Sequence, residues 1–432
     1  MKYSAVIDYL FQQFPSYKKY GAKAIKYGLH NIEALCEALD NPQEKFKSIH
    51  VAGTNGKGSV THILSAIFIA AGYKTGTFTS PHYVNFRERI KINGVYISKN
   101  EVVKFVTKNK ILFEQNNASF FEITAAMAFW HFQQQQVDIA IIETGLGGRL
   151  DSTNIIRPQL SVITNIGFDH QSMLGNTLQE IAGEKAGIIK PNVPVVIGEN
   201  QPEVKQVFVD KSKAVGAAIV YANEVLCLEK LTTTNEIDKC VYKASYQKRK
   251  ESITFETDLK ASYQMKNLTT ALASADVYIN KYNLTFEKNS LQKALRNIKA
   301  TTKMLGKWMC LQNKPIVIAD SAHNKAGVNA ALKTLSNYNY NKLHIVLGMM
   351  KDKDIDEVLK LLPKNANYYF CSPNFLRAMD AQQLKQQAEN FNLNGETCTS
   401  VSKAKETAIE KALEEDLVLI TGSCFVVGEI IK

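Results

Sequence analysis

A glycine-rich stretch near the start of the chain constrains its fold more than any other feature. The sequence IHVAGTNGKGSVTHIL covers residues 49–64. A common phosphate-binding loop reads G-x-x-x-x-G-K followed directly by Ser or Thr. Here Gly58 separates Lys57 from Ser59, and Val51 stands where the first glycine would fall. The stretch is therefore close to a phosphate-binding loop, with one inserted glycine.

The sequence around this stretch supports a phosphate-binding function. The β-branched run FKSIHVAG predicts a buried strand, and KGSVTHILSAIFIAAGY has apolar residues at helical spacing. A strand, a glycine loop and a helix together form the setting in which backbone N–H groups bind phosphate. Gly53, Gly56 and Gly58 would let these groups approach an anion, Lys57 would add a charge, and Ser59 would offer a hydroxyl to Mg²⁺. The alternative is a glycine-rich turn without a ligand.

The segments that follow predict an α/β unit. Strands alternating with helices favour a mostly parallel sheet covered on both faces, with ligands beyond the carboxyl ends of its strands. The predicted strands are 137–143, 159–170 ending with Asp169 and His170, and 193–198, and the predicted helix is 177–190.

Three side chains at or just past these strand ends could share one metal ion: Ser59, Glu143 and His170. An acidic residue that closes a strand beside a phosphate loop is a usual second metal anchor. Each residue also has a simpler interpretation. His170 could cap a helix or lie in the core, Glu143 could pair with Arg149, and Lys185 could be a surface lysine.

The second half of the chain changes in pattern. The segment 220–259 alternates in the manner of antiparallel strands, and a helical stretch follows at about 267–298. A new α/β series then begins, so we expect two domains, 1–299 and 300–432. Its predicted strands lie in 314–324, 342–350, 366–373 and 416–423.

This second series has no phosphate loop of its own. Its strand ends carry Asp320, His323 and Arg377 instead. These side chains could close over a nucleotide held by the first domain. The alternative is that His323 only forms hydrogen bonds at the end of a strand and contacts no ligand.

Composition limits the class of protein. The chain has 432 residues, a net charge of +11 and seven scattered cysteines without a C-x-x-C pair. We expect neither a disulfide framework nor a structural zinc site, and a cytoplasmic protein. The N-terminal sequence predicts an amphipathic helix rather than a signal peptide, and no membrane-spanning helix is expected. The positive charge suits polyanions, but the densest basic run, 246–252, is more typical of an exposed hairpin than of a nucleic-acid site.

A series of short motifs occurs in order along nearly the full length of the chain: AGTNGKGS, SPH, RERI, FFEITAAMAF, ETGLGGRLDSTN, GFDH, GEKAGI, DSAHN and TGSCFVVGE. With these motifs the chain closely resembles the folylpolyglutamate synthase family, in particular the bacterial type that also acts as dihydrofolate synthase, within the wider Mur ligases. The inserted glycine is characteristic of the loop in this family.

The resemblance implies a fold and a reaction. The fold is a Mur-ligase-type P-loop ATPase domain, with a mostly parallel sheet and a small antiparallel sheet, followed by a Rossmann-like α/β domain. The reaction is ATP-dependent addition of L-glutamate to dihydropteroate, to folates, or to both. A substrate carboxylate takes the γ-phosphoryl group of ATP, and the amine of glutamate attacks the resulting acyl phosphate.

The resemblance also implies roles for individual residues. The catalytic residues are Lys57, His170, Lys185 and His323. The ATP-binding residues are Gly53, Thr54, Asn55, Gly56, Lys57, Gly58, Ser59, Asn267, Lys307, Asp320 and His323. The metal-binding residues are Ser59, Ser80, Glu143, His170 and Lys185. The substrate-binding residues are Pro81, His82, Arg89, Phe121, Asp151, Ser152 and Ser423.

Three positions need comment. Lys185 matches a lysine that the family carbamylates, which turns an ammonium into a carboxylate able to bind Mg²⁺. Lys307, in LGKW, stands where the family usually has the arginine of P-G-R, and Lys and Arg bind phosphate differently. Ser321 stands in DSAHN where glycine is common.

Two alternatives remain at this point. One is a Mur-type ligase with another carboxylate substrate, and the other is a non-catalytic P-loop nucleotide switch. The expected partners are small molecules, with neither nucleic acid nor membrane, and the expected state is a monomer. The expected cofactors are ATP and Mg²⁺, with a monovalent cation such as K⁺ as a further candidate.

Overall fold

The computed structural model describes residues 1–15, 28–233, 240–351 and 355–432. It divides into two compact units. The first unit comprises Met1–His82, Phe86–Lys260 and Gln264–Met304, and the second comprises Tyr83–Asn85, Ala261–Tyr263 and Leu305–Lys432. Within the described ranges, no helix has both the length and the apolar character needed to cross a membrane.

The first unit is built on an eight-stranded sheet. Its strands run parallel except for β3 and β4, which add an antiparallel edge. The strands in sheet order are β4 (Val95–Tyr96), β3 (Ile90–Ile92), β2 (Thr75–Phe78), β5 (Ile139–Glu143), β1 (Lys47–Ala52), β6 (Leu160–Ile163), β7 (Val195–Ile197) and β8 (Ile219–Tyr221).

Helices cover both faces of this sheet, because alternate strand residues point to opposite sides. Ile139 and Ile141 of β5 join one apolar cluster with helix α4, whereas Ala140 and Ile142 join another with helix α6. The helices of the unit are α1 (Tyr3–Gln13), α3 (His30–Ala38), α4 (Lys57–Ala70), α5 (Lys99–Gln115), α6 (Phe120–Gln134), α7 (Gln171–Leu174), α8 (Leu178–Ala186), α9 (Pro202–Ala214), α10 (Ala222–Val225), α11 (Gln264–Lys281), α12 (Lys288–Arg296) and α13 (Ile298–Thr302).

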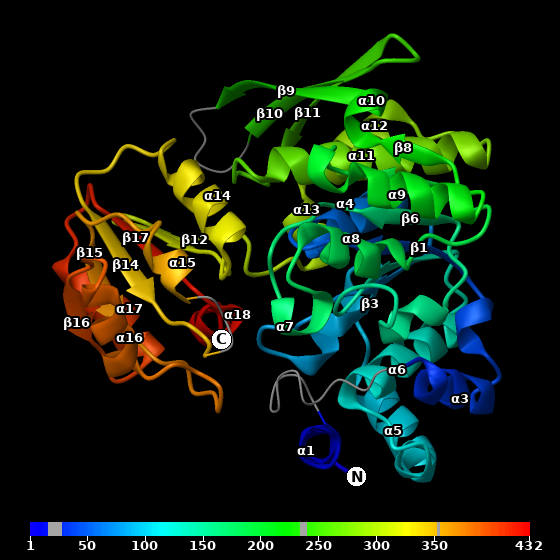
Figure 1. Ribbon diagram of the computed structural model, residues 1–432, viewed down its shortest axis with the longest axis horizontal. Coiled ribbons are helices and arrows are strands. Elements are labelled where there is room, and N and C mark those ends of the chain that lie inside the picture. The colour runs from blue at the N-terminus through cyan, green and yellow to red at the C-terminus, as the bar shows by residue number, and fades with distance from the viewer. Residues whose placement is uncertain (16–27, 234–239, 352–354) are drawn as a thin grey trace. The chain divides into compact units, whose positions relative to one another are not determined.

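A small antiparallel sheet also belongs to the first unit. It consists of β9 (Leu226–Thr233), β10 (Cys240–Tyr246) and β11 (Glu251–Thr257), in the order β11-β10-β9. It packs on α11 and α12 through an apolar cluster that includes Tyr242, Phe255 and Leu268 (Figure 1). The basic run 246–252 forms the connection between β10 and β11, so the hairpin prediction is confirmed.

The second unit is an α/β sandwich around a six-stranded sheet. The sheet is parallel except for β12, and clusters around Ile345 and Val346 cover its two faces. Its strands in sheet order are β12 (Met309–Asn313), β13 (Ile316–Ala319), β17 (Leu417–Thr421), β14 (Leu343–Leu347), β15 (Asn367–Phe370) and β16 (Gly395–Thr397). Its helices are α14 (Lys325–Leu335), α15 (Ile355–Leu359), α16 (Ala381–Glu389), α17 (Val401–Lys411) and α18 (Cys424–Ile430).

The predicted α/β class, with its small antiparallel sheet, is confirmed, and two strand predictions are wrong in detail. The strand expected to end with His170 ends at Ile163, and residues 164–170 form a loop. The alternating segment that begins at residue 220 is not one antiparallel strand. Its first residues finish β8 of the parallel sheet, and the short helix α10 separates them from β9.

Candidate active site

The glycine loop between β1 and α4 has a conformation that requires glycine at two positions. Gly53 has φ +148° and Gly56 has φ +88°. A Cβ on Gly53 would lie 1.8 Å from Thr164 Oγ1, and one on Gly56 would lie 2.3 Å from Asn267 Oδ1. Both distances are far below van der Waals contact, so any side chain would displace the loop. The bare loop backbone is what an anion needs for close approach to N–H groups.

The loop that follows β6 holds the glycine loop in place. The Asn55 N–H donates to Asn165 Oδ1 at 3.0 Å, and the Thr54 N–H donates to the carbonyl oxygen of Asn165 at 2.9 Å. Thr164 Oγ1 donates to the Asn55 carbonyl at 2.6 Å. Thr54 Oγ1 exchanges hydrogen bonds with the Gly167 backbone. Sequence reasoning missed Thr164 and Asn165, because nothing in a single sequence indicates which loop will lie beside another.

Two lysine side chains meet at one carbonyl oxygen of the loop. Lys57 Nζ donates to the Gly53 carbonyl at 2.9 Å and to the Thr54 carbonyl at 3.3 Å. Lys185 Nζ, from α8, donates to the same Gly53 carbonyl at 2.9 Å. Two ammonium groups this close repel each other, so the arrangement favours an anion beside them or loss of a proton from one of them.

The proton of Lys185 is held less firmly than that of an ordinary lysine. Its side chain is 3% exposed, so the alternative of a surface lysine is wrong. Burial, and after it the charge of Lys57, lowers the pKa of Lys185 to about 7. The carboxylates of Asp169, Asp151 and Glu184 act in the opposite direction. A large fraction of Lys185 is therefore a neutral amine near neutral pH.

Glu143 lies beside the start of α4, at the carboxyl end of β5. It is buried, and its Oε2 accepts a hydrogen bond from the Ser80 N–H at 3.2 Å. A Cβ on Gly58 would lie 3.6 Å from each of its carboxylate oxygens. Arg149 pairs with Glu184 at 2.8 Å rather than with Glu143. The carboxylate is therefore close to the helix start and to Ser80.

A buried lysine that sequence reasoning missed lies near this carboxylate. Lys91 is 2% exposed, and its Nζ is 3.5 Å from Nε2 of the buried His62. Burial lowers the pKa of Lys91 to about 8, although the charges of Glu88 and Glu143 oppose that change. Lys91 directly follows the RERI stretch, but a single sequence does not indicate which residues of a strand face inward.

His170 lies on the loop before α7 rather than on a strand. It has φ +53°, and its Nε2 is 3.8 Å from Asp169 Oδ1. The same loop carries Asp169, whose charge acts on Lys185. His170 is therefore on the segment that borders the lysine pair.

The residues around the glycine loop fit a magnesium ion. Among the residues that the structure describes, no three His, Cys, Asp or Glu side chains gather as a metal cluster. Mg²⁺ does not need such a cluster, because it is usually bound by one or two carboxylates together with substrate phosphates and water. The buried carboxylate of Glu143 and the buried Ser59 hydroxyl, at the start of α4, are donors of that kind.

Several predicted substrate-binding residues lie together after β2 and at the start of α6. Arg89 Nε donates to His82 Nδ1 at 2.8 Å, and the Arg89 guanidinium lies 5.5 Å from the centre of the Phe120 ring. The Phe121 ring lies so close to Gly145 that a Cβ there would be 2.4 Å away. The Ser80–Pro81 peptide bond is cis. His82, Arg89 and Phe120 thus form a buried aromatic and basic cluster, and Phe121 lies against the turn that follows Glu143.

Asp151 holds that turn together. Its Oδ2 accepts from the Leu146 N–H at 2.8 Å, and its Oδ1 accepts from the Thr153 N–H and hydroxyl. Burial raises the pKa of Asp151, while these hydrogen bonds lower it. Ser152 begins a short 3₁₀ helix immediately afterwards. The geometry gives Asp151 a positioning function, and its contact with substrate stays a prediction.

In the second unit, the end of β13 carries a fixed carboxylate. Asp320 is 2% exposed. Its Oδ2 accepts from the Tyr263 hydroxyl at 2.6 Å and from the Trp308 N–H at 2.9 Å, and its Oδ1 accepts from the Ala322 N–H at 2.9 Å. These bonds determine the path of the backbone just after Asp320.

The remaining predicted residues lie at helix starts or beside this strand end. Lys307 Nζ donates to Ser321 Oγ at 2.9 Å, and His323 Nδ1 donates to the Ser321 carbonyl at 2.9 Å. Ser423 caps α18 by accepting the Phe425 N–H. Asn267, in the first unit, is buried next to Gly56.

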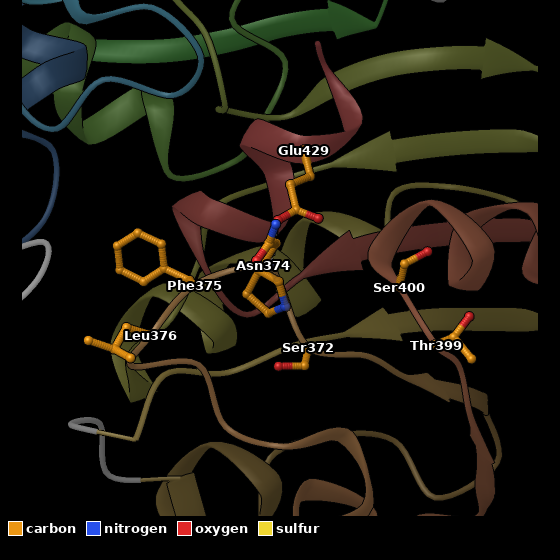
Figure 2. A pocket seen from close by; sticks show the side chains of 8 residues that line it. Ser372, Asn374, Phe375, Leu376, Thr399, Ser400 and Glu429 are labelled. Atoms are coloured by element: carbon orange, nitrogen blue, oxygen red, sulfur yellow. Dashed lines mark hydrogen bonds between the residues drawn. The ribbon is translucent and has the colours of Figure 1, made fainter. Parts of the chain in front are cut away.

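An open pocket of about 740 Å³ also lies in the second unit, beyond the carboxyl ends of β15 and β16 (Figure 2). Hydroxyls and the carboxylate of Glu429 face it, and none of the described residues that line it is basic. A phosphate or a dicarboxylate would find no counter-charge on these residues, so we do not assign the pocket to the reaction. The lining residues are Ser372, Pro373, Asn374, Phe375, Leu376, Thr399, Ser400 and Glu429.

Comparison with known proteins agrees with this geometry. Residues 51–275 match the family described as "Mur ligase middle domain", and residues 289–424 match "Mur ligase, glutamate ligase domain". The chain is 35% identical to the dihydrofolate synthase/folylpolyglutamate synthase of Bacillus subtilis, over 94% of this chain and 95% of that protein. It is also similar to two solved structures. One is Mycobacterium tuberculosis folylpolyglutamate synthase complexed with ADP and AMPPCP (TM-score 0.87, 29% identity, 99% of this chain and 98% of that chain). The other is E. coli FolC in complex with DHPP and ADP (TM-score 0.84, 28% identity, 100% and 97%).

Proposed function

Since this chain belongs to the dihydrofolate synthase/folylpolyglutamate synthase family of Mur ligases, we propose that it joins L-glutamate to dihydropteroate, to folates, or to both. It is an ATP-dependent ligase. The observation that supports the proposal most strongly is the meeting of Lys57 and Lys185 at the Gly53 carbonyl, inside a glycine loop at a helix start. Such a site is built for a polyphosphate anion.

The chain's own residues account for the binding of two anions. The N–H groups of residues 53–58 would hold the nucleotide phosphates, and the Lys57 ammonium would offset their charge. Repulsion between ATP and a substrate carboxylate is thereby reduced. Ser59, Ser80, Glu143, His170 and the carbamate form of Lys185 would hold Mg²⁺, which would supply Lewis-acid polarisation of the phosphoryl oxygens.

The reaction then proceeds in two steps. A carboxylate oxygen of the acceptor attacks the γ-phosphorus, and the bond from phosphorus to the bridging oxygen of ADP breaks. The amine nitrogen of glutamate attacks the acyl carbon of the resulting acyl phosphate, inorganic phosphate leaves, and the nitrogen loses one proton. Holding both substrates against one rigid loop makes each attack effectively intramolecular.

We also propose that Lys185 reacts with CO₂. The neutral amine attacks the carbon of CO₂ to form a carbamate, and one proton is released. The carbamate carries a negative charge, so it would turn the repulsion between Lys185 and Lys57 into attraction. The low pKa of Lys185 supports this step, because only the neutral amine is a nucleophile.

The remaining assignments are proposals of the same kind. Nucleotide contacts are proposed for Asn267, Lys307, Asp320 and His323, with the functional domains divided as 1–299 and 300–432. Acceptor or glutamate contacts are proposed for Pro81, His82, Arg89, Phe121, Asp151, Ser152 and Ser423. We further propose a cytoplasmic monomer with small-molecule substrates only, and K⁺ as an additional activator.

The function is tested by measuring phosphate release with each substrate omitted in turn. Release should require ATP, L-glutamate and a pteroate or folate acceptor together. Dihydropteroate and tetrahydrofolate, supplied separately, distinguish the two activities. A nucleotide switch would release phosphate without glutamate or not at all, and a ligase for another carboxylate would be inactive with both acceptors.

Replacing Glu143 by glutamine should raise the Mg²⁺ concentration needed for half-maximal activity at least about tenfold. The substitution keeps the shape of the side chain and removes the charge that attracts the ion. Glu33→Gln, on the exposed face of α3, is the matched control. His170→Ala should act in the same direction. The metal assignment is wrong if Mg²⁺ titrations of both variants coincide with that of the unmodified enzyme.

A further inference from the structure

We propose that Ser321 is a positioning residue that holds Lys307 and His323 in the orientation in which they meet the nucleotide. The inference rests on the proposed function and goes beyond it, because Ser321 is not among the residues proposed to contact ATP and would act through Lys307 and His323. It concerns how the flexible side chain of Lys307 is held in place at a position where the resemblance implies an arginine, whose guanidinium group is planar and rigid.

The side chain of Ser321 has two hydrogen-bonding partners. Ser321 is 2% exposed. Its Oγ accepts a hydrogen bond from Lys307 Nζ at 2.9 Å and shares another with the Tyr83 hydroxyl at 3.0 Å. A serine hydroxyl has one donor and two acceptor positions, so it can serve both partners at once. Glycine at this position could serve neither.

The backbone of Ser321 connects the same residues. Its N–H donates to the Gly306 carbonyl at 3.1 Å, which ties it to the residue before Lys307. Its carbonyl accepts from His323 Nδ1 at 2.9 Å. One residue therefore contacts both proposed nucleotide ligands, Lys307 through its side chain and His323 through its main chain.

Neighbouring groups keep Ser321 and its partners rigid. The three hydrogen bonds to Asp320 fix the backbone on one side of Ser321. Gly306 has φ +70°, and a Cβ on it would lie 2.1 Å from the Tyr83 ring. The Tyr83 ring thus packs directly against the backbone of Gly306, just before Lys307, and its hydroxyl is held near Ser321 Oγ.

This geometry connects two positions at which the chain differs from the pattern that the resemblance implies. That pattern has arginine in place of Lys307 and glycine in place of Ser321. In the structure these two side chains touch. The Ser321 hydroxyl restrains an ammonium that would otherwise sample many rotamers, and it thereby recovers part of the order that a guanidinium has intrinsically.

A double-mutant cycle on nucleotide affinity tests the inference. The full-length unmodified enzyme, Lys307→Ala, Ser321→Ala and the double variant are titrated with ATP by calorimetry, and KM is measured for ATP and for glutamate. Ser321→Ala should weaken ATP binding about tenfold, the effect of one hydrogen bond to a charged group. In the Lys307→Ala background the same substitution should change affinity less than about twofold.

Controls separate positioning from folding. Ser336→Ala removes a hydroxyl from the exposed end of α14 and should leave ATP affinity unchanged. Thermal unfolding of every variant should resemble that of the unmodified enzyme. KM for ATP should rise in Ser321→Ala while KM for glutamate stays constant, a difference that a general loss of structure would not produce.

Two results would overturn the inference while the proposed function stands. One is unchanged ATP affinity in Ser321→Ala. The other is a loss of ATP affinity on Ser321→Ala that is just as large in the Lys307→Ala background as in the unmodified enzyme. Failure of the proposed function itself would be visible earlier, as an unmodified enzyme without ATP-dependent ligation.

Discussion

Replacing Lys57 by alanine should abolish glutamate ligation, with kcat/KM lowered about a thousand-fold or more. In the proposed function, the ammonium is the charge that the glycine loop presents to the transferring phosphoryl group, and the transition state for that transfer is dense in negative charge. The fold should be unaffected, because Lys57 is half-buried at the first position of α4 and donates to loop carbonyls rather than packing in an apolar cluster.

The measurement is product formation at saturating ATP, alongside circular dichroism. Lys108→Ala, on the exposed face of α5, is the matched control and should retain normal activity. A purified and folded Lys57→Ala enzyme with near-normal turnover would disprove the phosphate-loop assignment.

Replacing Lys185 by alanine should lower turnover about a hundred-fold or more, because a proposed metal-binding group would be lost. The cavity that remains is buried and lies next to Lys57. A small carboxylic acid such as acetate should fill it and restore part of the activity. Lys185→Arg keeps the charge but forms no carbamate, so it should be inactive and insensitive to acetate.

The carbamate itself should be visible by carbon NMR of the enzyme in ¹³CO₂, as a signal that is missing in Lys185→Arg. The signal should increase as pH rises through about 7, because deprotonation of the ammonium produces the reactive amine. A fully active Lys185→Ala enzyme would contradict the carbamate proposal. So would the absence of a carbamate signal from the unmodified enzyme in ¹³CO₂ at pH ~8, about one unit above the pKa of Lys185.

Much of the fold follows from local patterns in the sequence. The strand before the glycine loop and the strand that ends at Glu143 are buried apolar runs bounded by glycine, and both occur as expected. The sequence does not predict the edge strands β4, β12 and β16. They are short and partly exposed, and β12 contains the pair Gln312 and Asn313, so their pattern does not differ from that of a loop.

The two incorrect strand ends have a similar cause. The local sequence does not indicate at which residue a strand stops pairing with the neighbouring strand. At Ile163 the chain leaves the sheet, and the residues up to Gly167 bond to the glycine loop instead. At Tyr221 the chain ends its pairing with β7 and turns into α10. Both changes depend on tertiary pairing.

The site shows the same limit. Residue types and their order point to Lys57, Glu143 and Lys185 as chemically important. That Lys57 and Lys185 share one carbonyl oxygen, or that Ser321 contacts Lys307, follows only from the folded chain. A lowered pKa at Lys185 likewise depends on burial, which its sequence neighbours do not determine.

The make-up of the second unit limits how this protein can be divided into fragments. A fragment that begins at Leu305 would omit Ala261–Tyr263 and Tyr83–Asn85, which belong to that unit. The fragment would lose three sets of hydrogen bonds: those between the Tyr263 hydroxyl and Asp320, between Ser262 and Thr334, and between the Tyr83 hydroxyl and Ser321. Chimeras that exchange C-terminal halves between relatives therefore need to carry all three stretches of chain that make up the unit, or else match the recipient at each of these contacts.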